Sequence, residues 1–172
     1  MKKSTKTYLF CFDDYRGFTE DVRKRFADTS RYTVKSFQAR EEFLSGLEME
    51  REHSFCKIAI LSLHDTKENY DLIGKLTMEI KNIDPRTGII LIGPVEKMEE
   101  IKKIIEFNID SYIPKNANSI LRIHNTVKKL ISEHSILVSR KKRNISSFVL
   151  LVFLVLSLLF TIFAYFSLPQ YF

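Results

Sequence analysis

Tryptophan, cysteine, proline and glycine are absent or scarce in this sequence. Its 172 residues contain no tryptophan, two cysteines, four prolines and five glycines. No long repeat, low-complexity tract or glycine- and proline-rich linker interrupts the first 139 residues, so we expect one domain of ordinary size plus an appendage. Two cysteines are too few to indicate a secreted disulfide scaffold. Cys11 and Cys56 lie in apolar runs, where a free thiol behaves as a small hydrophobe, so we expect both to be buried and inert.

Net positive charge is also low outside one short segment. The formal net charge is +6, and Arg140, Lys141, Lys142 and Arg143 supply four of these charges, which leaves +2 for the rest of the chain. A nucleic-acid-binding domain usually carries a basic stripe across its fold, whereas this basic cluster adjoins an apolar segment. We therefore expect no nucleic-acid partner.

The end of the chain lacks charge altogether. No charged side chain follows Arg143, and residues 148–168 consist mainly of Leu, Val, Phe and Ile. About twenty such residues match the length of a helix that crosses a bilayer, and a helix satisfies its own backbone there. The sequence thus predicts a single transmembrane helix at 148–168, in contact with membrane lipid, with a short far-side tail at 169–172. The basic cluster before it predicts that the N-terminal domain is cytoplasmic.

Residues 1–133 alternate between two hydrophobic periods. Short apolar runs with strand character are each followed by a segment with apolar residues at helical spacing. Strict alternation of this kind predicts an α/β fold with a five-stranded parallel sheet and helices on both faces. Strands are expected at 8–12, 32–37, 57–63, 88–92 and 111–113, and helices at 18–27, 41–50, 70–83, 95–107 and from 118 onward.

The residues just after these strands are the candidates for a functional site, because the working crevice of such a sheet lies beyond its carboxyl ends. The segments LFCFDD and DSYIPK, and more weakly YDLIGKL, make residues 5 to 133 resemble the receiver domain of bacterial response regulators. The resemblance implies a flavodoxin-like fold in which an acid pair binds Mg²⁺, an aspartate ending the third strand accepts a phosphoryl group, a Thr or Ser ending the fourth senses it, and a lysine pairs with it. Asp13, Asp14 and Lys115 match the acid pair and the lysine.

Two positions depart from that pattern. Ser62 stands where the phosphoacceptor aspartate is expected, and a serine hydroxyl cannot form an acyl phosphate and needs a base to attack. Asp65, three residues later, is the alternative acceptor if the loop curls back. Gly93, followed by Pro94, replaces the hydroxyl residue of the fourth strand. Both departures predict a degenerate phosphorylation site.

Structural roles compete with functional ones at the remaining positions. Asp14 suits a helix N-cap, so Asp13 and Asp14 either bind Mg²⁺ or only cap and shape the first helix. Lys115 suits a structural ion pair with these acids. His64 has no second His or Cys at ligand spacing, so we interpret it as a solvated loop histidine. No other cofactor is predicted.

The last helix carries an apolar seam that extends past the end of the sheet. Residues 134–147 are expected to form a basic juxtamembrane helix or linker. Its seam residues suit either a short parallel homodimer stalk or contact with lipid headgroups. The seam follows alternating steps of three and four residues through Ile120, Ile123, Val127, Leu130, His134 and Leu137.

Taken together, these features predict a non-enzymatic, membrane-tethered pseudo-receiver that acts as a signalling or protein-interaction module with an unknown protein partner. One alternative is an active phosphoreceiver of a two-component phosphorelay that uses Asp65. The other is a small ligand-binding or enzymatic flavodoxin-like domain. Against this second alternative, the sequence has no glycine-rich phosphate loop after the first strand, because the segment DDYRGF there contains one glycine.

Overall fold

The computed structural model describes residues 6–13, 16–53, 55–62, 67–97, 99 and 108–167. It divides into two compact units, Met1–Ser132 and Glu133–Phe172. The first unit holds the sheet and its helices, and the second holds the greater part of the last helix.

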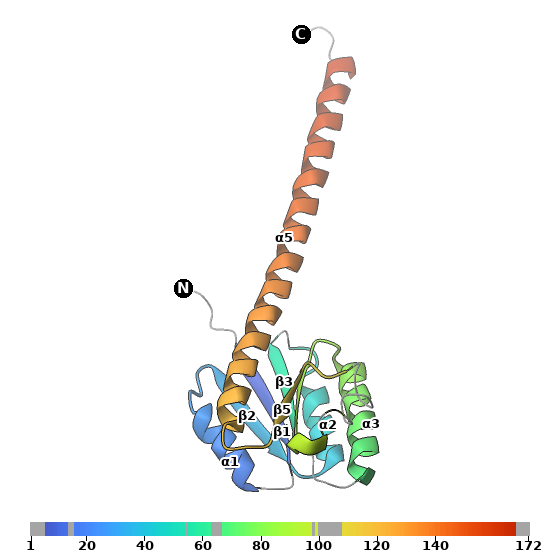
Figure 1. The fold of residues 1–172 in the computed structure, drawn as a ribbon. Helices are drawn as coiled ribbons and strands as arrows, with labels where there is room; N and C mark the ends of the chain where they lie inside the picture. The colour runs from blue at the N-terminus through green and yellow to red at the C-terminus, as the bar shows by residue number, and fades with distance from the viewer. Residues whose placement is uncertain are drawn as a thin grey trace. The chain divides into compact units, whose positions relative to one another are not determined.

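All the strands of the first unit run parallel in one sheet (Figure 1). The order β2-β1-β3-β4-β5 places β1 and β3 side by side near the centre, where the chain changes the direction in which it adds strands. The five-stranded parallel sheet predicted from the sequence is confirmed. The strands are β1 (Thr7–Phe12), β2 (Tyr32–Phe37), β3 (Cys56–Ser62), β4 (Gly88–Gly93) and β5 (Ser111–Pro114).

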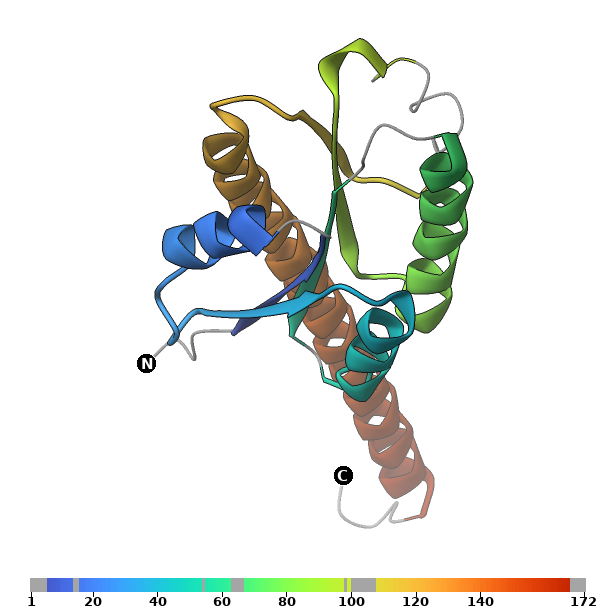
Figure 2. The ribbon, with the colours of Figure 1, turned by 90° about the horizontal axis from the view of Figure 1, so that it is seen from below.

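Helices cover both faces of this sheet. Figure 2 shows α1 (Arg16–Arg25) and the start of α5 (Ser119–Ser167) on one side, and α2 (Arg40–Met49) and α3 (Lys67–Ile83) on the other. Successive strand residues point to opposite faces, so each strand contributes to two cores. In β3, Ile58 and Ile60 pack toward α1 and α5, whereas Ala59 and Leu61 pack toward α2 and α3. Both faces are therefore apolar, which explains why β3 is buried along its whole length.

Two elements differ from their predicted extent. Of the helix expected over 95–107, Val95–Lys97 form a 3-10 helix and Glu99 is helical, while residues 98 and 100–107 lie outside the described residues. The last helix runs without interruption from Ser119 to Ser167, so the segment 134–147 is helical. The predicted tail at 169–172 lies outside the described residues.

The transmembrane prediction is not confirmed. Within the described ranges, no helix meets the combined length and apolarity expected of one that crosses a membrane. Side chains of α5 are described as far as Phe163, so the last part of the predicted span 148–168 lies outside them. The side chains described from Phe148 to Phe163 are all exposed.

Candidate functional site

The candidate site lies at the carboxyl edge of the sheet, around the ends of β1 and β3. The last paired residues of these strands are Phe12 and Leu61. Asp13 follows Phe12 and Ser62 follows Leu61, so both residues lie at the same edge of neighbouring strands, and Ser62 pairs with Ile92 of β4. The fold therefore places the first predicted metal ligand next to the degenerate phosphoacceptor position.

Ser62 is the last residue of β3 and is buried, with 6% of its surface exposed. By strand alternation its side chain points to the same face as Ile60, the face covered by α1 and α5. Its Oγ is inaccessible and forms no hydrogen bond within the described part of the chain. A hydroxyl without a hydrogen-bonded base is a poor nucleophile at neutral pH.

Asp13 follows β1 directly and is 4% exposed. Its backbone N–H donates to the carbonyl of Phe37 at 3.4 Å, which extends the pairing of β1 with β2 by one residue. Its predicted companion Asp14 lies outside the described residues, as do His64 and the alternative acceptor Asp65. Mg²⁺ binding by the acid pair stays a prediction.

The ends of β4 and β5 are joined through their backbones. The Lys115 N–H donates to the Gly93 carbonyl at 2.8 Å, one step beyond the pairing of Gly93 with Pro114. The Lys115 side chain is exposed and makes no ion pair with a carboxylate of the described ranges. Gly93 is buried and contributes no side-chain hydroxyl, as the sequence predicts.

A hydrogen-bonded turn holds the backbone that follows Lys115. The Ser119 hydroxyl lies 2.9 Å from the carbonyl of Pro114 and accepts the Asn116 N–H at 2.7 Å. The side chain of Asn116 accepts the N–H of Asn118 at 3.0 Å. Sequence reasoning missed these contacts, although Asn and Ser just before a helix are their usual signal.

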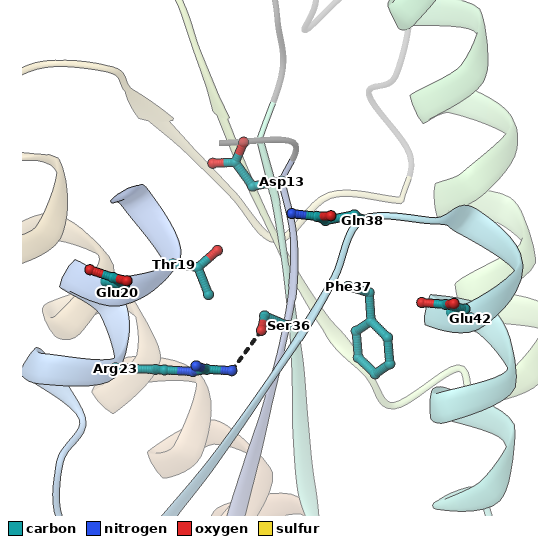
Figure 3. A pocket seen from close by; sticks show the side chains of 8 residues that line it. All are labelled: Asp13, Thr19, Glu20, Arg23, Ser36, Phe37, Gln38 and Glu42. Atoms are coloured by element: carbon teal, nitrogen blue, oxygen red, sulfur yellow. Dashed lines mark hydrogen bonds between the residues drawn. The ribbon is translucent and has the colours of Figure 1, made fainter. Parts of the chain in front are cut away.

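A cavity of about 310 Å³ opens beside Asp13 (Figure 3). Its polar lining includes an Arg23 guanidinium that donates to the Ser36 hydroxyl at 2.7 Å. Three carboxylates and one guanidinium give the lining a formal charge of −2, and its volume is at the low end for small-ligand sites. The sequence did not reveal it, because its residues come from the end of β1, from α1, from β2 and the residue after it, and from α2. They are Asp13, Thr19, Glu20, Arg23, Ser36, Phe37, Gln38 and Glu42.

The cysteines are buried, as expected from their apolar surroundings. Burial raises the pKa of the Cys56 thiol to about 12, and it does the same for Cys11, where nearby Arg23 opposes the shift and Asp13 adds to it. A thiol with this pKa carries almost no thiolate at neutral pH, which makes it a weak nucleophile. No group of three or more metal-ligating side chains gathers in the described ranges.

Comparisons with known proteins identify the fold. No family model and no curated protein matches the sequence. A response-regulator receiver domain from Clostridium thermocellum is 13% identical, with a TM-score of 0.62, over 76% of this chain and 98% of that one. The BeF3-activated receiver domain of DrrB is 23% identical, with a TM-score of 0.56, over 74% and 98%.

The chain has the receiver fold. A structure described as an adenylate cyclase from Rhodopirellula baltica shares it at 9% identity, with a TM-score of 0.64, over 80% of this chain and 96% of that one. The receiver fold predicted from LFCFDD and DSYIPK is therefore confirmed. At these identities the likeness concerns the backbone fold and transfers no chemistry.

Proposed function

We propose that this chain is a non-enzymatic pseudo-receiver, a signalling or protein-interaction module that keeps the receiver fold without phosphotransfer to an aspartate. The observation that carries the proposal is the position and burial of Ser62. It ends β3 at the position where the phosphoacceptor is expected, and its hydroxyl is buried without a hydrogen bond to a described group. A partner protein would then recognise the domain surface itself, and not a phosphorylated state of it.

The chemistry of the acceptor position supports this function. Transfer to an aspartate forms an acyl phosphate, whereas a serine would form an ester and would first need a base to remove its proton. Asp13 and Ser62 lie at the same edge of neighbouring strands, yet the Ser62 hydroxyl has no described hydrogen-bond partner to receive that proton. Gly93 supplies no hydroxyl to read a phosphate, and its carbonyl is engaged by the Lys115 N–H.

Phosphorylation with a small phosphodonor and Mg²⁺, read by intact mass, tests the proposal. We expect no adduct on the wild-type chain, and none on Ser62→Ala. Ser62→Asp restores the carboxylate and should gain one phosphoryl group if the acid pair still binds Mg²⁺. A wild-type adduct that Asp65→Asn abolishes would instead establish the active phosphoreceiver.

We further propose that α5 tethers the module to a membrane, with the receiver domain in the cytoplasm. The support comes from the continuous helix to Ser167 and the exposed apolar side chains from Phe148 to Phe163. Arg140 and Arg143 are exposed shortly before them, in a sequence whose basic residues favour the cytoplasmic side. A tether would raise the effective concentration of the module near a membrane-bound partner.

Fractionation of cells that express the chain tests the tether. The full chain should stay in the membrane pellet after an alkaline wash, whereas a chain ending at Ser139 should move to the soluble fraction. If the full chain is extracted as readily as the shortened one, the tether is wrong and the exposed apolar residues need another partner.

The cavity beside Asp13 favours a second candidate function, the binding of a small ligand. Its volume of about 310 Å³ and its net negative, hydroxyl-rich lining suit a small cationic ligand with hydrogen-bonding groups. A screen of small amines by thermal shift, on wild type and on Thr19→Leu, would test it. Stabilisation of the wild type that is lost in the cavity-filling variant would support this function over the first.

A further inference from the structure

The fold separates charges that are mixed along the sequence. Counted along their sequences, α1 and residues 119–132 of α5 carry seven Lys or Arg and two Asp or Glu, a formal charge of +5. Together α2 and α3 carry four Lys or Arg and six Asp or Glu, a formal charge of −2. Since each helix pair covers one face of the sheet, one side of the domain is basic and the other is weakly acidic (Figure 2). The basic side is therefore where an anionic ligand would bind.

Within this basic side, Arg25 of α1 and His124 of α5 are in contact. The Arg25 Nη2 lies 3.3 Å from the His124 Nδ1. A guanidinium can only donate, so the Nδ1 must accept and the neutral ring carries its proton on Nε2. The Phe26 ring lies 5.6 Å from the imidazole between centroids and helps to fix its orientation. The contact leaves the other guanidinium N–H groups of Arg25 as donors.

Lys128 brings a second cation to the same place. It lies one helical turn after His124, a spacing at which two side chains are neighbours on a helix surface. Neither Arg25 nor Lys128 forms an ion pair with a carboxylate in the part of the chain that the structure describes. Two cations thus lie around His124 without a described counter-ion.

We propose that Arg25, His124 and Lys128 form a phosphate-binding site between α1 and α5. The guanidinium of Arg25 offers planar N–H groups that match phosphate oxygens, and the ammonium of Lys128 neutralises charge beside the imidazole. The site lies away from the carboxyl edge, is formed within the first unit, and does not depend on the membrane tether or on the state of Ser62. The ligand is a phosphate group, carried either by a lipid headgroup or by a small dissolved compound.

The protonation of His124 is consistent with such a site. Burial lowers the pKa of His124, and the positive charges of Arg25 and Lys128 lower it further, against a hydrogen bond with Asn125 that raises it. A bound anion would oppose both cations and raise this pKa again. The pKa of His124 therefore reports whether an anionic ligand is bound.

The experiment is a pH titration of the His124 ring by NMR on the full chain, labelled at histidine and held in phosphatidylcholine bilayers. Inorganic phosphate, compared with chloride at equal ionic strength, should raise the pKa of His124 by about one unit. The double variant Arg25→Gln with Lys128→Gln should no longer show this rise in the pKa of His124. The matched control Lys75→Gln, at an exposed position of α3, should still show it. If phosphate and chloride act alike, a dissolved ligand is excluded, and if phosphatidylglycerol also leaves the pKa of His124 unchanged, the site is overturned.

A second arm separates the two sources of phosphate. Phosphatidylglycerol is added to the bilayers with no dissolved phosphate. A rise in the pKa of His124 that needs Arg25 and Lys128 would identify the lipid headgroup, and a rise with dissolved phosphate alone would identify a soluble ligand. A DNA duplex that binds more tightly than phosphate would contradict the proposal if Arg25→Gln with Lys128→Gln leaves its binding unchanged. Failure to insert into bilayers would count against the tether only, because the dissolved-phosphate titration can be repeated in detergent.

Discussion

Lys57 and Asp84 form a buried ion pair at the amino end of the sheet. The Lys57 Nζ lies 2.7 Å from an Asp84 Oδ2, and the two side chains are 1% and 6% exposed. The ammonium also donates to the Arg51 carbonyl at 3.1 Å, and the other carboxylate oxygen accepts the Arg86 N–H at 3.0 Å. Both charges are thus hydrogen-bonded, which is the condition for a buried pair to be tolerated. The pair joins the start of β3 to the turn between α3 and β4.

Breaking this pair should destabilise the fold strongly. Lys57→Met leaves the Asp84 carboxylate buried without its cation, and we expect the free energy of unfolding to fall by about 3–5 kcal/mol. Urea denaturation of the variant measures it. The control Lys75→Met, at an exposed position of α3, should change that free energy by about 0.5 kcal/mol or less. Equal effects of the two substitutions would contradict this role of Lys57.

The same pair predicts a pH dependence. Burial tends to raise the pKa of Asp84, but the hydrogen bond and charge of Lys57 and the contacts with Arg86 outweigh it and lower this pKa below its usual 3.8. The stabilisation is therefore present above the unfolded pKa and is lost as pH falls through the lower folded pKa. In Lys57→Met the carboxylate gains from protonation, so the stability gap to wild type should narrow from pH 7 to pH 3. Urea midpoints at both pH values test this, and an unchanged gap would show that Asp84 is not the group responsible.

Two helical glycines should respond in opposite ways to alanine. A Cβ at Gly46 in α2 would lie 2.6 Å from the Phe37 ring, which is held by Phe10 and Phe43 at centroid distances of 6.2 Å and 5.7 Å. Overpacking costs about 1–3 kcal/mol, so Gly46→Ala should lower the melting temperature. Gly74 in α3 has nothing within 4 Å of such a Cβ, and Gly74→Ala should raise stability by up to about 1 kcal/mol. Thermal unfolding of both variants measures these changes. Stabilisation by Gly46→Ala would contradict the close approach of Gly46 to the Phe37 ring.

The two thiols should resist alkylation in the folded protein. With a pKa near 12 for each of Cys11 and Cys56, the thiolate fraction at pH 8 is very small, and both side chains are buried. We expect a thiol reagent to label neither residue under native conditions and both in urea. Rapid native labelling of either one would mean that its strand opens locally.

The dimer stalk predicted from the helical seam can be tested because the native cysteines are inert. Leu137 is 62% exposed at a seam position, whereas Leu121 is 51% exposed outside the seam. If the helices pair, Leu137→Cys should form a disulfide dimer under mild oxidation and Leu121→Cys should not. Equal crosslinking at both positions would indicate random collision in the membrane, and no crosslinking would favour a monomer.

Local sequence patterns were sufficient to predict much of the fold. The apolar run at 57–63 predicted a strand of a parallel sheet, and the structure places this strand, β3, at the centre. The segments LFCFDD and DSYIPK indicated the receiver fold, because acids and lysine at strand ends occupy fixed places in it. The absence of an aspartate at Ser62 and of a hydroxyl at Gly93 was also evident from the sequence, since strand ends are set by local periodicity.

The sequence by itself determined the order of the elements, the departures at the acceptor positions and the apolar, uncharged chain end. Only the tertiary structure decided that Lys57 is buried against Asp84, that a cavity opens beside Asp13, and that Arg25 contacts His124 on a basic side of the domain. Periodicity reports which side of its own element a residue occupies. It does not report which distant residue faces it, because that depends on how the strands are ordered and which helices share a face of the sheet.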